Sequence, residues 1–404
     1  METGPILRAL SRNKTGALLI ALQIAFTMTV VVNAWYMVGE RLGNIDRPSG
    51  LLEEDIFYVS STGFAEDFNI KVTIEEDLLA LRQLPGVVDA VTINAVPLSG
   101  GGWSMGLRID PGDDTQSWPV AVYMVDQHGV NTLGLNLVAG DDFDVADVEW
   151  REPGQTSWPD KVVISQAMAT AMFPDMDLNN IVGKTVYISN DEPVMISGIV
   201  EKLQAPWSGW NSIEQSMLVP QKTAFSSVRY MVRTEPGRLD EVIPRVETTL
   251  LNLNDGRLVR NTMTMTETRE RGYLLDQGLA TILTVVMAVL LLITAVGVLG
   301  LASFSVRRRT RQIGVRRALG ATQQDILRYF LVENACIALI GVFAGALMTV
   351  GLNAWLVGAM SFPKIQWGAI PIGMILLVLV AQLSVIGPAR RACGVSPAVA
   401  TRTV

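Results

Sequence analysis

Few residues of this 404-residue chain have the types and spacing that chemistry on a substrate needs. The run Val182-Gly183-Lys184-Thr185 ends like the phosphate-binding motif G-x-x-x-x-G-K-[ST], but Leu178 stands where the first glycine belongs. His128 is the only histidine, so histidine catalysis or a histidine metal cluster lacks partners, and we interpret it as a surface or turn residue. The pair Asp141-Asp142 lacks calcium-loop spacing and indicates solvated charge.

These observations predict no catalytic residue, no bound cofactor and no metal ion. Nucleic acid is not expected among the partners either. A membrane-anchored enzyme stays open as an alternative class, because combinations of Ser, Asp and Lys side chains are not recognisable from sequence alone.

The chain concentrates its chemistry in one basic segment, Phe304 to Phe330, which carries seven arginines and a single acid, Asp325. Its flanks, Leu279 to Phe304 and Asn334 to Phe362, contain no charged residue. Both flanks exceed the roughly 20 apolar residues of a membrane-spanning helix. Because arginine in short loops stays on the cytoplasmic side, we expect a cytoplasmic loop between two spans.

Charge and hydropathy predict two further spans in a chain that is 49 % hydrophobic, with mean hydropathy +0.33 and net charge −7. Basic residues precede the apolar run Thr15 to Val38 and follow the run Ile365 to Ala389, so both termini are expected in the cytoplasm. These residues are Arg8, Arg12, Lys14, Arg390, Arg391 and Arg402. The predicted segments are cytoplasmic 1–14, spans 15–38, 277–304, 331–360 and 368–388, cytoplasmic 305–330 and 389–404, and a short periplasmic loop 361–367.

The first span has an alternative interpretation as a cleaved signal peptide, because basic residues precede it. Its apolar run exceeds the roughly 7–15 residues of a signal peptide and no clear small-x-small site closes it, which favours an uncleaved anchor. The two cysteines, Cys336 and Cys393, fall in the third span and the cytoplasmic tail. We therefore expect no disulfide in the outer domain.

Residues 39–276 hold nearly all the Asp and Glu and are expected to form a large acidic periplasmic domain. Ile56 to Val59 and Val87 to Val96 predict strands on either side of a helix opened by a capping box at Thr73. Val228 to Val232 predicts another strand.

A helical pattern from Leu239 to Leu250 follows that strand, although Pro244 requires the helix to start near Asp240 or to kink. The two separated half-units predict a split ferredoxin-like layer. Residues 118–220, rich in strands and turns, predict an inserted, mainly β subdomain with a helix at Ser165 to Phe173.

Several features of the spans bear on packing. Asn261 to Gln277 leads into the second span without proline, which predicts a continuous helical stalk. Gly341-x-x-x-Gly345 in the third span allows close approach of a neighbouring helix. Glu333, beside the basic loop, is interpreted as interfacial. The other polar residues within the spans are Gln23, Asn33, Asn334, Asn353 and Gln382.

The basic loop also resembles a family signature. Thr310-Arg311-Gln312-Ile313-Gly314-Val315-Arg316-Arg317-Ala318-Leu319-Gly320-Ala321 is similar to ERTREIGVRRALGA of MacB/FtsX-type ABC transporter permeases. Pro388-Ala389-Arg390-Arg391-Ala392, continued by 396–400, resembles the family's ending, and Ala139 to Phe143 resembles part of its outer domain. In the family the element matching Gly183 to Val186 is a strand turn and not a nucleotide loop.

The resemblance implies an α+β integral membrane protein of the bacterial inner membrane with four transmembrane helices (1+3). Its large periplasmic α/β domain would combine a split ferredoxin-like (Porter-like) layer with the inserted mainly β (Sabre-like) subdomain. The implied partners are membrane lipid, a cytoplasmic ABC ATPase dimer that binds ATP and Mg, and a second permease subunit, identical or different. A periplasmic adaptor and an outer-membrane channel stay open as further partners.

In relatives the cytoplasmic loop forms a coupling helix seated on the ATPase. The resemblance thus implies coupling roles for Arg311, Gln312, Ile313, Gly314, Val315, Arg316, Arg317, Ala318, Leu319 and Gly320. A helix from Thr310 to Leu319 is expected to present Ile313 and Arg317 toward one side, with Arg316 and Leu319 nearby, as an apolar anchor with a cationic rim. Topology alone would explain the arginines but not the apolar residues. Arg308 and Gln312 replace both glutamates of ERTRE, which indicates a matched, distinct partner.

The sequence thus predicts a non-catalytic permease subunit that converts ATP-driven closure of partner ATPases into movement of its periplasmic domain, for efflux or extrusion of a substrate. An FtsX-like signalling or scaffold subunit, which regulates a cell-envelope hydrolase, is the alternative from another class. The sequence does not identify the substrate.

Overall fold

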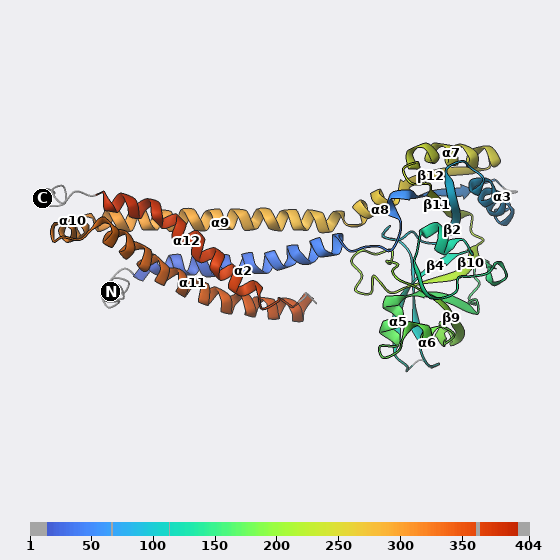
Figure 1. Ribbon diagram of the computed structural model, residues 1–404, viewed down its shortest axis with the longest axis horizontal. Helices are drawn as coiled ribbons and strands as arrows, with labels where there is room; N and C mark the ends of the chain where they lie inside the picture. Colours follow the sequence, from blue (N-terminus) through green and yellow to red (C-terminus); the bar gives the residue numbers. More distant parts are fainter. Residues whose placement is uncertain (1–13, 66–67, 113, 361–363, 395–404) are drawn as a thin grey trace. The chain divides into compact units, whose positions relative to one another are not determined.

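The computed structural model describes residues 14–65, 68–112, 114–360 and 364–394, and the chain divides into two compact units (Figure 1). The helical unit comprises the chain up to Ile45 and from Asp276 onward, and the α/β unit comprises Asp46–Leu275. Residues 1–13 of the predicted N-terminal segment, 361–363 of the short loop and 395–404 of the C-terminal segment lie outside the described residues.

Four long helices form most of the helical unit: α2 (Lys14–Ile45), α9 (Leu274–Arg308), α11 (Gln323–Met360) and α12 (Ala369–Cys393). Each is long and apolar enough to cross a membrane. Each also extends past its predicted span at one end or both, because helical hydrogen bonding continues beyond the hydrocarbon. The short helix α10 (Thr310–Ala318) joins α9 to α11.

Three of these helices pack tightly, since α11 contacts both α2 and α12 along its length. Their shared core includes Ile24, Met28, Ala338, Val342 and Leu377, each completely buried. Helix α9 differs from the other three. In its 18-residue apolar stretch only 11 % of the residues are buried, compared with 44 % in the corresponding stretch of α2. Most of α9 is therefore left uncovered by the described residues of the chain.

The α/β unit begins with a four-stranded sheet in the order β12-β1-β11-β2, with antiparallel neighbours throughout. Its elements are β1 (Ile56–Gly63), α3 (Ile70–Arg82), β2 (Val87–Ile93), β11 (Ser227–Thr234), α7 (Leu239–Leu253) and β12 (Arg257–Thr264). The pattern is two β-α-β halves whose strands interleave. The split ferredoxin-like layer expected from the sequence is confirmed.

Two local details of this layer concern how its helices begin. The capping box expected at Thr73 is wrong, because α3 starts earlier and Asn69 caps it by accepting a hydrogen bond from the Val72 amide at 3.4 Å. Thr73 is instead buried inside the helix. Helix α7 begins at Leu239, so Pro244 falls early in the helix and lacks only one amide donor.

The inserted subdomain is a mixed sheet in the order β4-β3-β8-β9-β7-β10-β6, with β5 paired to β9. Its strands are β3 (Trp103–Arg108), β4 (Ser117–Val125), β5 (Leu137–Gly140), β6 (Glu149–Arg151), β7 (Lys161–Ser165), β8 (Thr185–Ile188), β9 (Glu192–Val200) and β10 (Ser216–Thr223). The subdomain therefore starts about fifteen residues before the predicted position 118, because β3 pairs with β4 and β8.

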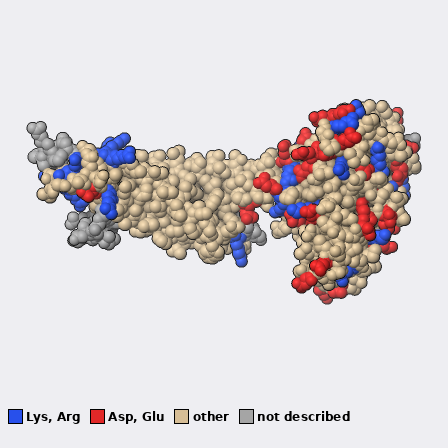
Figure 2. All heavy atoms as spheres, in the orientation of Figure 1, with Lys and Arg blue, Asp and Glu red and all other residues tan. Residues whose placement is uncertain are grey.

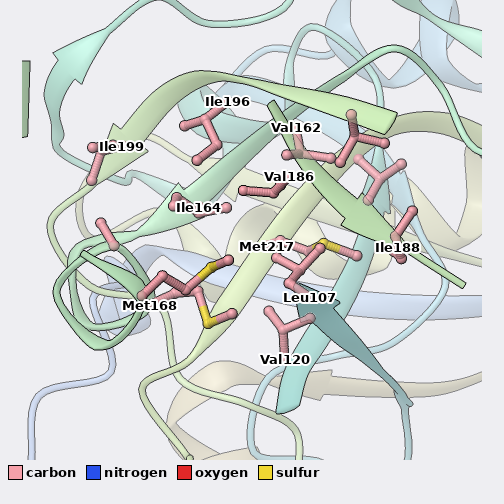
Figure 3. Close-up of a cluster of buried hydrophobic side chains, with 14 of the residues drawn as sticks. Leu107, Val120, Val162, Ile164, Met168, Val186, Ile188, Ile196, Ile199 and Met217 are labelled. Carbon is pink, nitrogen blue, oxygen red and sulfur yellow. The ribbon is translucent and has the colours of Figure 1, made fainter. Parts of the chain in front are cut away.

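Short helices and an apolar core complete the inserted subdomain. The helices are α4 (Gly129–Leu133), α5 (Gln166–Met172) and α6 (Leu178–Ile181), and the 3-10 turns of the unit are η1 (Glu53–Asp55) and η2 (Val145–Asp147). Figure 3 shows residues of the core, in which Val162, Ile164 and Met217 are completely buried and Met168 joins them from α5. The described cysteines, Cys336 and Cys393, both lie outside the α/β unit, so this apolar packing holds the subdomain together.

The expected continuous stalk over Asn261 to Gln277 is wrong. Strand β12 pairs with β1 as far as Thr264, where a capping box with Glu267 starts α8 (Met265–Gly272). Tyr273 then separates α8 from α9. Backbone pairing to a neighbouring strand outweighs helix propensity here, and no proline was needed to interrupt the helix.

Asp77 of α3 is the centre of a buried polar network in the ferredoxin-like layer. The Arg257 guanidinium donates to both carboxylate oxygens, with Nη2 2.9 Å from Oδ1, and neither side chain is exposed. The Tyr230 hydroxyl donates to the same carboxylate. Burial, followed by the charge of Asp77, raises the pKa of Tyr230 well above its ordinary value, so the tyrosine keeps its proton. The network links α3 to β11 and β12.

The variant Asp77→Asn removes the charge that pairs with Arg257. We expect a loss of about 3–5 kcal/mol in the free energy of unfolding, because one partner of a buried ion pair is left uncompensated. Chemical denaturation of the full-length protein in detergent, followed by tryptophan fluorescence, measures the loss. Glu76→Gln, on the exposed side of the same helix, should change stability by less than about 0.5 kcal/mol. Equal stability of Asp77→Asn and the parent would contradict this role.

Candidate coupling surface

One end of the helical unit is strongly basic. Figure 2 shows Lys and Arg side chains gathered there, whereas the middle of the helices is nearly free of charged residues on the face shown. Figure 1 shows α10, the C-terminal end of α9 and the C-terminal end of α12 together at this end. Because charged side chains avoid hydrocarbon, this end lies at a membrane surface and α10 is available to a partner in water.

The bundle holds α10 in a fixed orientation. Ile313 is only 5 % exposed and joins the same apolar cluster as Ile326 and Phe330. The Arg317 guanidinium donates to the carbonyl oxygen of Cys393 at 2.9 Å, which ties α10 to the end of α12. Both contacts are made within the chain, so they set the direction of α10 without a partner.

The burial of Ile313 overturns the expectation that Ile313 and Arg317 face a partner as anchor and rim. Val315 of α10 is 46 % exposed and Leu319, the residue that caps the C-terminal end of α10, is 83 % exposed, so these large apolar side chains face water. Ile313 and Val315 lie on different sides of the helix, and the sequence does not show which side packs against the bundle. The residues of the predicted site that the structure exposes are Arg311, Gln312, Val315, Arg316, Ala318, Leu319 and Gly320, whereas Gly314 is buried with Ile313.

The exposed face of α10 combines apolar and cationic groups. Arg311, Val315 and Leu319 recur every four residues and therefore share one side of the helix. Arg316 stacks beside them on the ring of Tyr329, with its guanidinium carbon 4.8 Å from the ring centre. We call Arg311, Val315, Arg316 and Leu319 the coupling surface. It offers an apolar centre flanked by two cations, of which Arg316 rests on an aromatic ring.

Glu333 is paired within the chain, and its interpretation as an interfacial residue stays a prediction. Arg309 donates to both of its carboxylate oxygens, at 2.8 and 3.0 Å, and the Glu333 side chain is 10 % exposed. The pair joins the end of α9 to the beginning of α11. It neutralises an acid that would otherwise be costly at this depth.

The other polar residues of the spans bond to helix backbone. Gln23 donates to the Ile293 carbonyl at 3.0 Å, Asn334 to the Ala381 carbonyl at 3.1 Å and Gln382 to the Leu331 carbonyl at 3.2 Å. Asn33 donates within its own helix at 2.8 Å, and Asn353 accepts from a backbone amide at 3.2 Å. These contacts join helices or complete backbone bonding.

The two glycines of the third span face α2. A Cβ atom at Gly341 would lie 2.9 Å from the Ala21 carbonyl oxygen, and one at Gly345 would lie 2.8 Å from the Met28 Cβ. Such distances leave no room for a side chain, so each glycine lets the two backbones approach closely.

In the α/β unit, the structure shows the roles of Gly183 and His128, whose residue types had raised the question of a nucleotide or metal site. Gly183, with φ of +85°, makes the turn that leads into β8, as expected for a strand turn. His128 lies in a turn as expected, but Asp89 holds its ring, with Nδ1 3.0 Å from Oδ2. Among the described residues, no group of three or more His, Cys, Asp or Glu side chains could hold a metal ion.

Four helices able to span a membrane, with an α/β domain after the first and a basic loop after the second, define a multi-pass membrane protein. A model of the MacB-like periplasmic core domain matches residues 17–256, and a model of the FtsX-like permease C-terminal domain matches residues 284–397. The chain belongs to the MacB/FtsX-type ABC transporter permease family. It is a multi-pass inner-membrane protein with a periplasmic domain.

Curated relatives include the macrolide export ATP-binding/permease protein MacB of Agrobacterium fabrum, 27 % identical over 55 % of this chain and 33 % of the relative. The uncharacterized ABC transporter permease YknZ of Bacillus subtilis is 28 % identical over 59 % of this chain and 61 % of its own length. The macrolide export ATP-binding/permease protein MacB of Azoarcus sp. is 27 % identical over 80 % of this chain and 47 % of its own length. The chain thus spans about a third to three fifths of these relatives.

Two solved structures show weaker likeness. The periplasmic region of MacB from Actinobacillus actinomycetemcomitans matches 57 % of this chain and 97 % of its own, with 15 % identity and a TM-score of 0.35. The extracellular domain of YknZ from Gram-positive bacteria matches 50 % of this chain and 100 % of its own, with 16 % identity and a TM-score of 0.32. Both scores are low, so the family assignment rests on the sequence matches.

The variant Gly345→Leu places a side chain where α11 meets α2. We expect a lower midpoint of thermal unfolding in detergent, because overpacking costs about 1–3 kcal/mol. Gly351→Leu on the same helix, where a Cβ meets nothing within 4 Å, is the matched control and should leave the midpoint unchanged. Similar midpoints for both variants would show that the glycine contact is unimportant.

Proposed function

We propose that this chain is the permease subunit of a MacB-like ABC transporter. It couples ATP hydrolysis by a separate ATPase subunit to movement of its periplasmic domain, and that movement drives efflux or extrusion of a substrate. The observation that carries the proposal is the coupling surface, which presents an exposed apolar side chain between two cations at the basic end of the helical unit.

The coupling surface has the properties of a binding hot spot. Leu319 is a large apolar side chain that water surrounds, and the exposed Arg311 and Arg316 lie on either side of the apolar residues. A partner with an apolar groove and an acidic rim would bury the leucine and pair with the arginines. ATP and Mg would be bound by that partner, and this chain would contribute no catalytic residue.

The orientation proposed is cytoplasmic for both termini and for α10, and periplasmic for the α/β unit. The basic end of the bundle supports it through the bias of arginine toward cytoplasmic loops. The arginines of this end are Arg307, Arg308, Arg309, Arg311, Arg316, Arg317, Arg328, Arg390 and Arg391.

A second permease subunit, identical or different, is proposed to cover α9. Large apolar side chains such as Leu292, Ile293 and Val296 are more than half exposed on that helix. Lipid alone would also solvate them, but α9 carries α10 at its end and so is the helix on which paired ATPases would act together. An adaptor and an outer-membrane channel would complete an export path.

The variant Leu319→Asp tests the coupling role. We expect unchanged folding and a loss of ATPase association of about 30-fold, because an interface hot spot contributes about 2 kcal/mol. Association is measured with a purified ABC ATPase that co-purifies with this chain, together with the ATPase rate. Leu319→Met keeps an apolar side chain and should retain association. Ile313→Asp should instead lower thermal stability, because it buries a charge inside the bundle.

Wild-type association by Leu319→Asp would contradict the coupling role. A macrolide, the cargo class in the names of several relatives, is a first probe of the ATPase rate. Association without any response to cargo, together with control of a cell-envelope hydrolase, would identify the FtsX-like signalling alternative.

Accessibility of single cysteines tests the orientation. After Cys336→Ser and Cys393→Ser, we expect Glu152→Cys to react with an impermeant maleimide on intact spheroplasts. Gln312→Cys should react only after the membrane is permeabilised, because arginine-rich loops stay cytoplasmic. The reverse pattern would exclude the proposed arrangement.

A further inference from the structure

A cavity of about 330 Å³ lies at the basic end of the helical unit, between α2, α9 and α11. Its volume falls in the range of about 300–1,000 Å³ that is usual for ligand sites. Most of its wall is apolar and includes Ile20, Leu301, Phe330 and Ile337. From Phe330 to Ile337 the wall extends about 10 Å along α11, at 1.5 Å per residue. The cavity therefore continues from the membrane surface into the level of the acyl chains.

The rim of this cavity is cationic. Arg308, the last residue of α9, lines it, is exposed, and forms no hydrogen bond or ion pair with the residues that the structure describes. Glu333 also lines the cavity, but Arg309 neutralises it by donating to both of its oxygens. Ser305 and Thr15 add hydroxyl groups to the wall. The acid is matched within the chain, and the charge of Arg308 is left for a ligand.

We propose that this cavity binds an anionic phospholipid, with one acyl chain between α2, α9 and α11 and the phosphate held by Arg308. A ligand for this site must combine an apolar tail with a negative head, because most of the wall is apolar and the rim carries a cation. Basic pockets between transmembrane helices on the cytoplasmic side bind such headgroups. The proposed orientation enters only in assigning the site to the cytoplasmic leaflet.

The lipid would stabilise a weak part of the bundle. Within the described residues, α9 is the least buried of the four spans, and its contacts with α2 include Gln23 to Ile293 and the hydroxyl pair Thr27–Thr294 at 2.7 Å. A lipid that touches α2, α9 and α11 together would join the end of α9 to the packed helices. That end leads directly into α10, so the site is placed to make the coupling surface depend on lipid composition.

Arg308 is also where this chain departs from the resemblance seen in its sequence. The first glutamate of ERTRE aligns with this position, and a carboxylate on the rim would repel a phosphate. Replacement by arginine reverses the charge at this position of the cavity lining. Anionic lipid selectivity at this site is therefore a property of this chain.

The test uses the full-length protein in a mild detergent, mixed with equal amounts of palmitoyl-oleoyl phosphatidylglycerol and palmitoyl-oleoyl phosphatidylethanolamine. Native mass spectrometry counts the lipid that stays bound. We expect phosphatidylglycerol to be retained in preference by the parent, and Arg308→Gln to reduce its retention about fivefold, the effect of one arginine at an anionic surface. Arg307→Gln removes the same charge from the adjacent exposed position, which does not line the cavity, and should change retention less than twofold.

Further arms separate the possible occupants. Ala302→Phe fills the cavity from α9 and should reduce retention while Arg308 is intact. Excess glycerol phosphate, which has the headgroup charge without the chain, should not displace the lipid. Equal retention of both lipids by the parent, equal loss in Arg307→Gln and Arg308→Gln, or displacement by glycerol phosphate would each overturn the proposal. No ATPase is present, so failure here leaves the coupling role to its own test.

Discussion

Arginine keeps its charge at any accessible pH, and hydrocarbon gives that charge no solvation. This constraint places the end of α9, all of α10 and the end of α12 at one membrane surface, since each carries arginine. Both the coupling surface and the lipid-sized cavity lie at that end. The middle of the helices is apolar because their charged residues lie toward the ends.

The arginines at this end have different roles, which their environments decide. Arg309 neutralises Glu333 inside the bundle, and Arg317 ties α10 to the carbonyl oxygen of Cys393. Arg316 stacks on Tyr329 and is held rigidly at the surface. Arg308 and Arg311 are exposed and stay available for ligands or partners. The arginines of one short segment thus stabilise the fold, form part of the proposed interface and line the proposed ligand site.

The two units are stabilised by different means. The α/β unit relies on packed sheets and on a buried network in which Arg257 and Tyr230 satisfy Asp77. The helical unit relies on close backbone approach at Gly341 and Gly345 and on polar side chains that bond to neighbouring backbones. In the proposed mechanism α9 is suited to movement because it is the least buried span and its helix is separated from α8 at Tyr273.

The sequence alone determined the four spans, the basic loop, the split ferredoxin-like layer and the inserted β subdomain, because hydropathy, charge and strand periodicity act locally along the chain. Local signals failed where a distant segment competed. The strand β12 replaced the first part of the expected stalk by pairing with β1, and Asn69 capped α3 in place of Thr73. Only the tertiary structure decided that Ile313 faces the bundle and Leu319 faces water, since both are apolar and burial depends on what packs against them.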